Sequence, residues 1–245
     1  MGGDVTAASA PSPEDLLVLV PARGGSKRLP RKHLAMLGGR PLLGRTYEAF
    51  QASGIQAPCV LSTDDPELAE VGRRLGFEVP FLRPARLATD DTPTLDVVLH
   101  AMDWYGAQRG ADPAAVMVLQ PTTPFRDPSD LRGALRLLHD SPGVDAVVGV
   151  RDLHRAPQDL YTARPEGLLR PLASDRGKQS VYTPNGALYL VRCAAVRREQ
   201  TLFPQAIVAL HMNPLADLDI DTAHDLAVAR AVEAAGLADT VGEDA

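Results

Sequence analysis

Two adjacent glycines among a run of cations form the stretch of the sequence best suited to bind an anion. The segment PARGGSKRLPRKHL, residues 21–34, follows the apolar run LLVLV directly. Gly24 and Gly25 carry no Cβ, so backbone amides at such a turn can approach and converge on an anion. The cations around them are Arg23, Lys27, Arg28, Arg31 and Lys32. Together these groups predict a nucleoside triphosphate site, with a plain basic surface turn as the alternative.

The spacing of the glycines narrows the class of nucleotide site. It matches neither GxxxxGK[ST] nor GxGxxG, which disfavours a P-loop ATPase and a dinucleotide-binding fold. The 245-residue chain has a formal net charge of −6 in spite of this basic stretch. That balance indicates a local anion site and argues against nucleic acid as a partner.

Two aspartates near the C-terminus could hold a hard cation. Asp219 and Asp221 stand two residues apart in LDIDT, so on an extended segment both carboxylates point to the same side. A divalent cation that also binds phosphate oxygens would fit such a pair. A helix N-cap is the alternative, for Asp221 in particular. Cys59 and Cys193 lie far apart in the chain and predict neither a disulfide nor a zinc site.

Hydrophobic patterning predicts the elements that position these groups. Apolar runs predict strands at residues 16–22, 57–63, 114–120, 145–152 and 185–192. Amphipathic spacing predicts helices at residues 41–53, 66–76, 92–110, 128–141 and 221–236. Strands that alternate with helices of this length predict an α/β fold with a mostly parallel sheet and helices on both faces. Ligands of such sheets bind beyond the carboxyl ends of the strands.

Several residues mark where the predicted helices begin and end. Gly76 is expected to end the second helix, because glycine readily adopts the left-handed conformation found there. Thr92 or Thr94 is expected to cap the third helix, and Asp221 or Thr222 the last one.

The chain divides into one folded domain and three segments that break its pattern. We expect the domain to span residues 15–236 and a disordered leader to occupy residues 1–14. The acidic stretch 237–245 is expected to be a frayed tail. Residues 153–184 are rich in Pro, Arg and Gly, and we interpret them as an excursion that could pack against a second subunit. Without a signal peptide or a run of about 18 apolar residues, we expect a cytoplasmic protein with no membrane partner.

Five blocks in chain order resemble the CMP-sialic acid synthetases, the acylneuraminate cytidylyltransferases. The first, PARGGSKRLPRKHL, resembles the family's nucleotide-binding signature. The others are STDDPELAEVGRRLGFEVPFLRPARLATDDT, LQPTTPFR, YTPNGALYL and DLDIDTAHDL. The resemblance implies a Rossmann-like fold of the nucleotide-diphospho-sugar transferase or GT-A type and a homodimer. It also implies that Mg²⁺ or Mn²⁺ assists the transfer of CMP from CTP to a small acidic acceptor, with release of pyrophosphate.

The resemblance further implies which residues form the site. Those that match the family's nucleotide contacts are Ala22, Arg23, Gly24, Gly25, Ser26, Lys27, Lys32, His33, Arg83 and Thr89. Those at catalytic positions are Arg23, Lys27, Asp219 and Asp221, of which the aspartates would bind the metal. Those at acceptor positions are Gln120, Arg176, Lys178, Gln179 and Asn185. A helix-leading cap is the alternative for Thr89, and loop hydrogen bonds are the alternative for Gln120 and Asn185.

Some positions depart from the family pattern. His33 stands where the family usually has Asn, although histidine can still donate a hydrogen bond. Gln158 and Asp159 occupy the region where a lysine that binds the acceptor would be expected. The segment RGKQSVYTPNG is shorter by one residue, so either Arg176 or Lys178 could take the part of the family's arginine.

Three hypotheses for the function remain open at this point. The first is a CTP-dependent cytidylyltransferase that forms a CMP ester of a sialic-acid-like nonulosonate. The second keeps this chemistry but acts on a phosphonate, as a CMP-phosphonate synthase of a natural-product pathway. The third is a non-catalytic nucleotide-binding module, against which the intact Arg-Gly-Gly loop and the LDIDT carboxylates argue.

Overall fold

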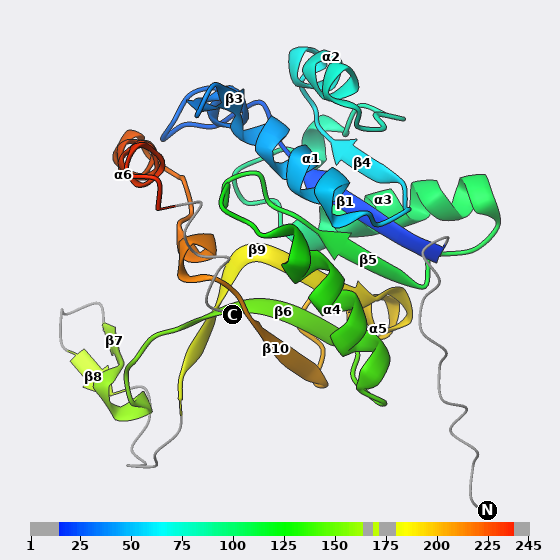
Figure 1. The fold of residues 1–245 in the computed structure, drawn as a ribbon. Helices are drawn as coiled ribbons and strands as arrows, with labels where there is room; N and C mark the ends of the chain where they lie inside the picture. The colour runs from blue at the N-terminus through cyan, green and yellow to red at the C-terminus, as the bar shows by residue number, and fades with distance from the viewer. Residues whose placement is uncertain (1–14, 164–168, 172–179, 238–245) are drawn as a thin grey trace, which may run out of the picture.

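A computed structural model describes residues 15–163, 169–171 and 180–237, which form a central sheet with helices on both faces (Figure 1). The expected leader and nearly all of the expected tail lie outside the described residues. So do three of the expected acceptor residues, Arg176, Lys178 and Gln179.

The sheet has six strands in the order β10-β6-β9-β5-β1-β4. Their bounds are Leu16–Pro21 for β1, Cys59–Ser62 for β4, Ala115–Val118 for β5, Ala146–Asp152 for β6, Tyr182–Arg192 for β9 and Ile207–His211 for β10. Strand β9 runs antiparallel to both of its neighbours, while the other pairs in this sheet are parallel. The mostly parallel sheet predicted from the sequence is therefore confirmed.

Six α-helices lie among the described residues. Their bounds are Leu42–Ser53 for α1, Pro66–Leu75 for α2, Thr94–Arg109 for α3, Pro128–Asp140 for α4, Cys193–Glu199 for α5 and Ala223–Ala234 for α6. Short 3-10 turns occur at Lys32–Leu34, Ala85–Leu87, Pro157–Asp159 and Pro214–Asp217. Within this described part of the chain, no helix is both long enough and apolar enough to cross a membrane.

Two apolar layers, one on each face of the sheet, form the core. Strand β1 contributes side chains to both layers, because successive side chains of a strand point to opposite faces. Leu16 and Val18 pack with residues of α1 and α4, whereas Leu17 and Leu19 pack with residues of α3 and α5. All four side chains are at most 1% exposed. Each contributes roughly 1.5–3 kcal/mol by leaving water, which makes β1 a rigid base for the loop that follows it.

The helix ends agree with the sequence in part. Gly76 ends α2 in the left-handed conformation, with φ of 109°, as predicted. Thr222 caps α6, and its side chain accepts a hydrogen bond from the Asp225 amide. The prediction that Thr92 or Thr94 caps α3 was wrong, because the cap is Pro93 without a side-chain hydrogen bond. The Thr92 hydroxyl is instead bonded to Thr89, within the loop that leads into α3.

Several short elements were absent from the sequence-based prediction. They are the strand β10, the helix α5 and two hairpins, formed by β2 (Met36–Leu37) with β3 (Arg40–Pro41) and by β7 (Tyr161–Ala163) with β8 (Leu169–Pro171). The hairpin strands have only two or three residues, too few to show a hydrophobic period, and β10 is an edge strand with its first residue exposed. The β7–β8 hairpin lies within the predicted excursion and projects from the main body (Figure 1).

Replacement of Gly76 by alanine tests how tightly α2 packs against α1. An added Cβ would collide with the Tyr47 side chain, whose Cε1 atom would lie 2.8 Å away, and the backbone φ of 109° disfavours any L residue. We expect Gly76→Ala to lower the free energy of unfolding by about 2–4 kcal/mol, measured by urea denaturation.

Gly54→Ala is the matched control. Gly54 ends α1 with φ of 70°, but nothing lies within 4 Å of the position of its Cβ. This variant should therefore lose only the conformational term, about 1 kcal/mol. Equal losses in the two variants would contradict the packing argument for Gly76.

Candidate functional site

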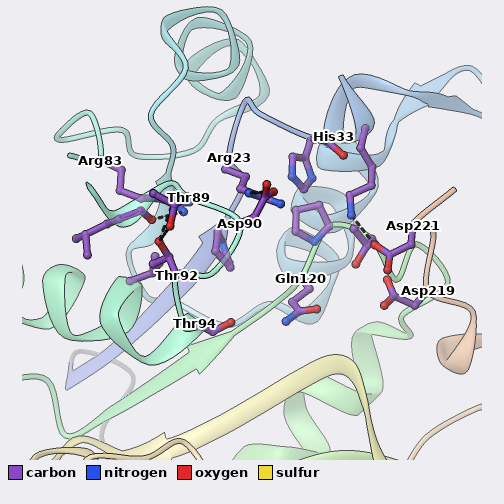
Figure 2. Close-up of a pocket in the computed structure, with 17 residues that line it drawn as sticks. Arg23, His33, Arg83, Thr89, Asp90, Thr92, Thr94, Gln120, Asp219 and Asp221 are labelled. Atoms are coloured by element: carbon purple, nitrogen blue, oxygen red, sulfur yellow. Dashed lines mark hydrogen bonds and ion pairs between the residues drawn. The ribbon is translucent and has the colours of Figure 1, made fainter. Parts of the chain in front are cut away.

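A cavity of about 320 Å³ opens at the carboxyl ends of β1 and β5, where the sequence places a ligand site (Figure 2). Pro21, the last residue of β1, and Gln120, just beyond β5, both line it. The predicted site residues on its wall are Arg23, Ser26, Lys32, His33, Arg83, Thr89, Gln120, Asp219 and Asp221. Residues separated by most of the chain are therefore brought together around one cavity.

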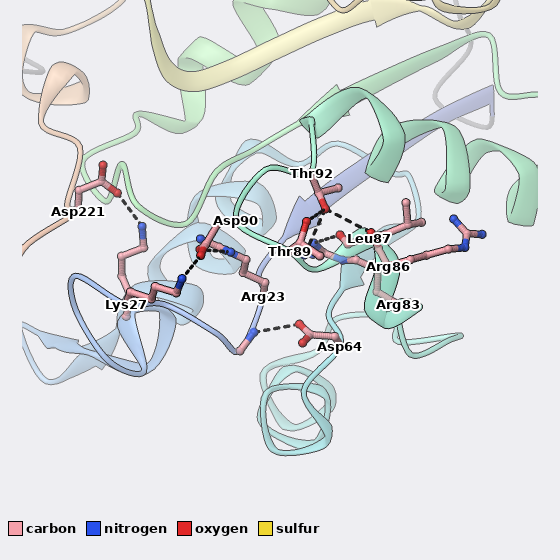
Figure 3. Close-up of polar contacts among 12 residues, drawn as sticks. Arg23, Lys27, Asp64, Arg83, Arg86, Leu87, Thr89, Asp90, Thr92 and Asp221 are labelled. Atoms are coloured by element: carbon pink, nitrogen blue, oxygen red, sulfur yellow. Dashed lines mark hydrogen bonds and ion pairs between the residues drawn. The ribbon is translucent and has the colours of Figure 1, made fainter.

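Position 24 of the Arg-Gly-Gly loop requires glycine because the loop backbone lies close to Asp65. The Gly24 amide donates a hydrogen bond of 3.0 Å to Asp64 Oδ1 (Figure 3). A Cβ at Gly24 would lie 2.8 Å from the Cβ of Asp65, whose carboxylate caps α2. Neither Gly24 nor Gly25 has a positive φ, so the turn does not depend on the conformational freedom of glycine. The absence of a side chain is what position 24 requires.

Two cations of this loop share one carboxylate. Arg23 Nη1 lies 2.7 Å from Asp90 Oδ1, and Lys27 Nζ lies 2.5 Å from Asp90 Oδ2 (Figure 3). Hydrogen bonds from Lys27 and Arg23 hold the pKa of Asp90 below its usual range. Asp90 lines the cavity but was not among the predicted site residues. Nothing in its local sequence pairs it with Arg23, which lies far away in the chain.

The two aspartates of LDIDT lie together on the opposite side of the cavity from Arg83 and Thr89 (Figure 2). Asp221 is bound by Lys32 at 2.8 Å and by Arg28 at 2.5 Å. Burial raises the pKa of Asp219, and the nearby charge of Asp221 adds to this, while a hydrogen bond from Thr122 opposes it. Burial also acts on Asp221, but Lys32 and Arg28 outweigh it and lower its pKa.

The carboxylates of Asp219 and Asp221 fit a magnesium ion that also binds phosphate oxygens. Mg²⁺ usually binds one or two carboxylates and completes its shell with water and substrate oxygens. Among the described residues there is no cluster of three or more His, Cys, Asp or Glu side chains that could hold a metal by itself. Thr222, not Asp221, caps α6, which leaves the Asp221 carboxylate directed at Lys32 and Arg28.

Arg83 and His33 are the buried basic residues of the cavity wall. Arg83 is anchored to the strand β4, since its Nε donates to the Ser62 hydroxyl at 3.1 Å and its Nη2 to the Ser62 carbonyl. Burial lowers the pKa of Arg83 to about 10. Burial and the charges of Lys32, Arg83 and Arg23 lower the pKa of His33 to about 3. His33 is therefore neutral, and its buried Nδ1 has no hydrogen-bond partner among the described residues.

The contacts of Thr89 exclude one of the two roles considered for it, and those of Arg126 tie two strands together. Thr89 does not cap α3; its hydroxyl lies 2.7 Å from that of Thr92 and it lines the cavity. Arg126 is 5% exposed and donates to the carbonyls of Ala187 and Gln120 at 2.7 and 2.9 Å. Arg126 thus ties β9 to the end of β5 and fixes the backbone of Gln120.

A second cavity of about 200 Å³ adjoins the first, and Gln120 and Asp219 line both. Asn185, a predicted acceptor residue, lies on its wall, where its Nδ2 donates to Asp217 Oδ1 at 3.2 Å. Its Oδ1 accepts a hydrogen bond from the Ala187 amide, so the loop role considered for Asn185 is also present. Arg151 of β6 lines this cavity as well, although sequence reasoning missed it, because 145–152 reads simply as a strand.

The remaining residues predicted to contact the nucleotide lie beside the first cavity and not on its wall. Ala22 is completely buried at the end of β1, and its amide donates to the Ser62 carbonyl. Lys27 is largely exposed and reaches the cavity through its contact with Asp90. Gly24 and Gly25 form the turn between Arg23 and Ser26, both of which line the cavity.

Comparisons with known proteins show the family to which the chain belongs. A family model described as cytidylyltransferase matches residues 17–238. The chain is 30% identical over 220 residues to a CMP-N,N'-diacetyllegionaminic acid synthase of Legionella pneumophila, covering 87% of this chain and 94% of that protein. It is 28% identical over 223 residues to an N-acylneuraminate cytidylyltransferase of Escherichia coli, covering 89% of this chain. The chain spans 52% of the length of that second relative.

A structural match extends the agreement to the fold. A structure of CMP:2-keto-3-deoxy-manno-octonic acid synthetase complexed with CTP has a TM-score of 0.67 to this chain at 18% identity. The match covers 90% of this chain and 99% of the other. The α/β fold of the nucleotide-diphospho-sugar transferase type expected from the sequence is confirmed. The chain therefore belongs to the cytidylyltransferase family that includes the CMP-sialic acid synthetases, and it is a nucleotidyltransferase.

Proposed function

We propose that this protein transfers CMP from CTP to a sialic-acid-like nonulosonate and releases pyrophosphate. The observation that carries the proposal is the pair of adjoining cavities that share Gln120 and Asp219. One cavity is lined by cations and by a carboxylate pair, as a triphosphate with a metal ion requires, and the other is large enough for part of a second substrate. The relatives named above act on acids of this class.

The nucleotide would bind in the first cavity. Arg23 and Lys27 are held by the exposed carboxylate of Asp90, so both side chains can turn to a triphosphate in place of it. Arg83 would face the base from a buried and fixed position. His33 is neutral and would donate or accept a single hydrogen bond, since it cannot add a charge there.

The reaction needs positioning and charge neutralisation more than covalent help. A hydroxyl of the acceptor forms the new bond to the α-phosphorus, its proton passes to the medium, and the bond to the β-phosphate breaks as pyrophosphate leaves with the electron pair. Asp219 and Asp221 would hold Mg²⁺ or Mn²⁺, which when bound neutralises negative charge on the phosphates. Gln120, at the junction of the cavities, would orient the attacking group.

Two features of the expected assembly belong to the same proposal. We expect a homodimer in which the excursion 153–184 packs against the second subunit. The projecting β7–β8 hairpin and the exposed Tyr161 side chain support this expectation. We also expect the enzyme to act in the cytoplasm, without nucleic acid or a membrane as a partner.

The two alternatives have less support. The comparisons do not favour a CMP-phosphonate synthase, because the relatives described above are named for sugar acids. A non-catalytic nucleotide-binding module would not need the carboxylate pair that the structure places on the cavity wall.

A substrate panel tests the proposal directly. Pyrophosphate release is measured with CTP and Mg²⁺ against N-acetylneuraminate, legionaminate, pseudaminate, Kdo and small phosphonates, with UTP and ATP as nucleotide controls. We expect turnover with at least one nonulosonate and with CTP alone among the nucleotides. Turnover with a phosphonate alone would replace the proposed acceptor, and CTP binding without turnover of any acid would favour the module.

Asp221→Ala tests the carboxylate pair. We expect kcat to fall by at least about 100-fold, because charge on the phosphates would lose part of its neutralisation. The far-UV circular dichroism spectrum and the melting temperature should stay close to wild type, since Thr222 and not Asp221 caps α6. Asp140→Ala, at the exposed end of α4, is the control and should leave kcat unchanged. A fully active Asp221→Ala enzyme would remove the metal assignment.

Asp90→Asn tests whether the carboxylate competes with the nucleotide for Arg23 and Lys27. Without the negative charge, we expect the Kd for CTP, measured by calorimetry, to fall about two- to fivefold, as fits exposed ion pairs. The pKa of Asp90 is lowered, so this difference should be constant between about pH 6 and pH 8. The neighbouring Asp91→Asn is the control, since Asp91 is exposed and lines neither cavity. Weaker CTP binding by Asp90→Asn would contradict this competition.

A further inference from the structure

The wall of the second cavity includes an arginine, Arg151, that the sequence analysis did not assign to the site. Arg151 lies near the end of β6, opposite Thr183 on β9. Just before it, the ladder between these strands changes register between Val148 and Val150. Such a bulge turns the strand and re-aims the side chains that follow it.

Gly149, at this bulge, leaves room for the side chains of Asn185 and Met212 to pack against β6. A Cβ at Gly149 would lie 2.8 Å from Asn185 Oδ1 and 2.6 Å from Met212 Sδ. Because that Cβ is absent, Asn185 can pack against β6 while its Nδ2 donates to Asp217. Arg151, Asn185 and Asp217 therefore line one cavity although they come from three different elements.

Among the described residues, no carboxylate forms an ion pair with the Arg151 side chain. Its guanidinium makes no ion pair or hydrogen bond with any residue in the described stretches 15–163, 169–171 and 180–237. It is also the sole cation among the described residues that line this cavity. The charge of Arg151 also acts on Asp217. Burial raises the pKa of Asp217, whereas a hydrogen bond from Asn185 and the positive charge of Arg151 both oppose that rise.

Of the positions where a cation was expected, those that the structure describes supply none to the second cavity. Gln158 and Asp159 stand in the region where a lysine would bind the acceptor, and neither lines the second cavity. Arg176 and Lys178 lie outside the described residues. An acidic acceptor in this cavity would thus meet Arg151 among the residues that the structure places on its wall.

We propose that Arg151 binds the acid group of the acceptor and thereby selects acids over neutral molecules. The inference rests on the proposed function and deepens it by assigning the residue that recognises the acceptor. A guanidinium binds a carboxylate through two parallel N–H···O contacts, which fix orientation as well as charge. The acceptor is accordingly a small molecule whose acid group lies at Arg151 and whose hydroxyl reaches the nucleotide past Gln120 and Asp219.

A different role for Arg151 would be to neutralise Asp217 and so stabilise the wall. The two roles differ in what the loss of the charge should change. If Arg151 recognises the acid, loss of its charge should raise the KM for an acid acceptor. The KM for the same acceptor without its charge should stay the same. If Arg151 has a structural role, loss of its charge should lower the melting temperature and kcat and change the KM for both substrates.

The test compares Arg151→Gln and Arg151→Lys with Arg155→Gln. Arg155 is the matched control, because it is exposed, lies four residues further along the chain and lines neither cavity. For each enzyme, KM and kcat are measured by pyrophosphate release with CTP, with the best acid of the panel and with its neutral amide. Melting temperatures are measured in parallel.

We expect Arg151→Gln to raise the KM for the acid about 10- to 100-fold, as fits the loss of hydrogen bonds between charged groups, and to leave the KM for CTP unchanged. The preference of wild type for the acid over the amide should disappear. Arg151→Lys should recover part of it, since lysine keeps the charge but not the planar pair of donors.

The outcomes separate the inference from the proposed function. If wild type turns over no acid of the panel, the proposed function fails and the inference falls with it. If wild type is active and Arg151→Gln keeps the same preference for the acid over the amide, the inference alone is overturned. A loss of stability with that preference retained would assign Arg151 to the wall and overturn the inference too.

Discussion

The site depends on one constraint of parallel sheets, which is that strands running the same way end at the same edge. β1 and β5 are neighbours, so the Arg-Gly-Gly loop after one and Gln120 after the other meet at that edge. β9 runs the opposite way beside β5, so its first half, and not its end, comes to the same edge. This reversal places Asn185 and Gly186 next to Gln120 and creates the second cavity. The apolar layers on both faces keep these strands in register.

Electrostatic balance is the second organising principle of the site. The cations of the loop would repel one another, and carboxylates from distant parts of the chain offset this repulsion. Asp90 precedes α3 and binds Arg23 and Lys27, while Asp221 precedes α6 and binds Arg28 and Lys32. Most of these side chains remain partly exposed, so the ion pairs are weak and can exchange for those of a polyanionic substrate. The two carboxylates thus offset half of the charge of these four cations before a substrate binds.

The two cavities differ in how their charges are supported. In the first cavity, the side chains that would meet the triphosphate come from a loop and can rearrange. In the second, Arg151 belongs to a strand of the central sheet and Asn185 is held by hydrogen bonds at both ends of its amide. Rigid elements position groups more accurately than loops. Under the proposed assignment, the second cavity is suited to selecting the acceptor and the first to accommodating the charge of the nucleotide.

The sequence by itself determined the alternation of strands and helices, the ends at Gly76 and Thr222, and the stretch around Arg23 that would bind an anion, because these depend on neighbouring residues. It did not reveal the reversed direction of β9, since a fully buried apolar run looks the same in either direction. Only the tertiary structure paired Asp90 with Arg23 and brought Arg151 to the second cavity. Such contacts depend on how distant segments pack, and no local pattern records them.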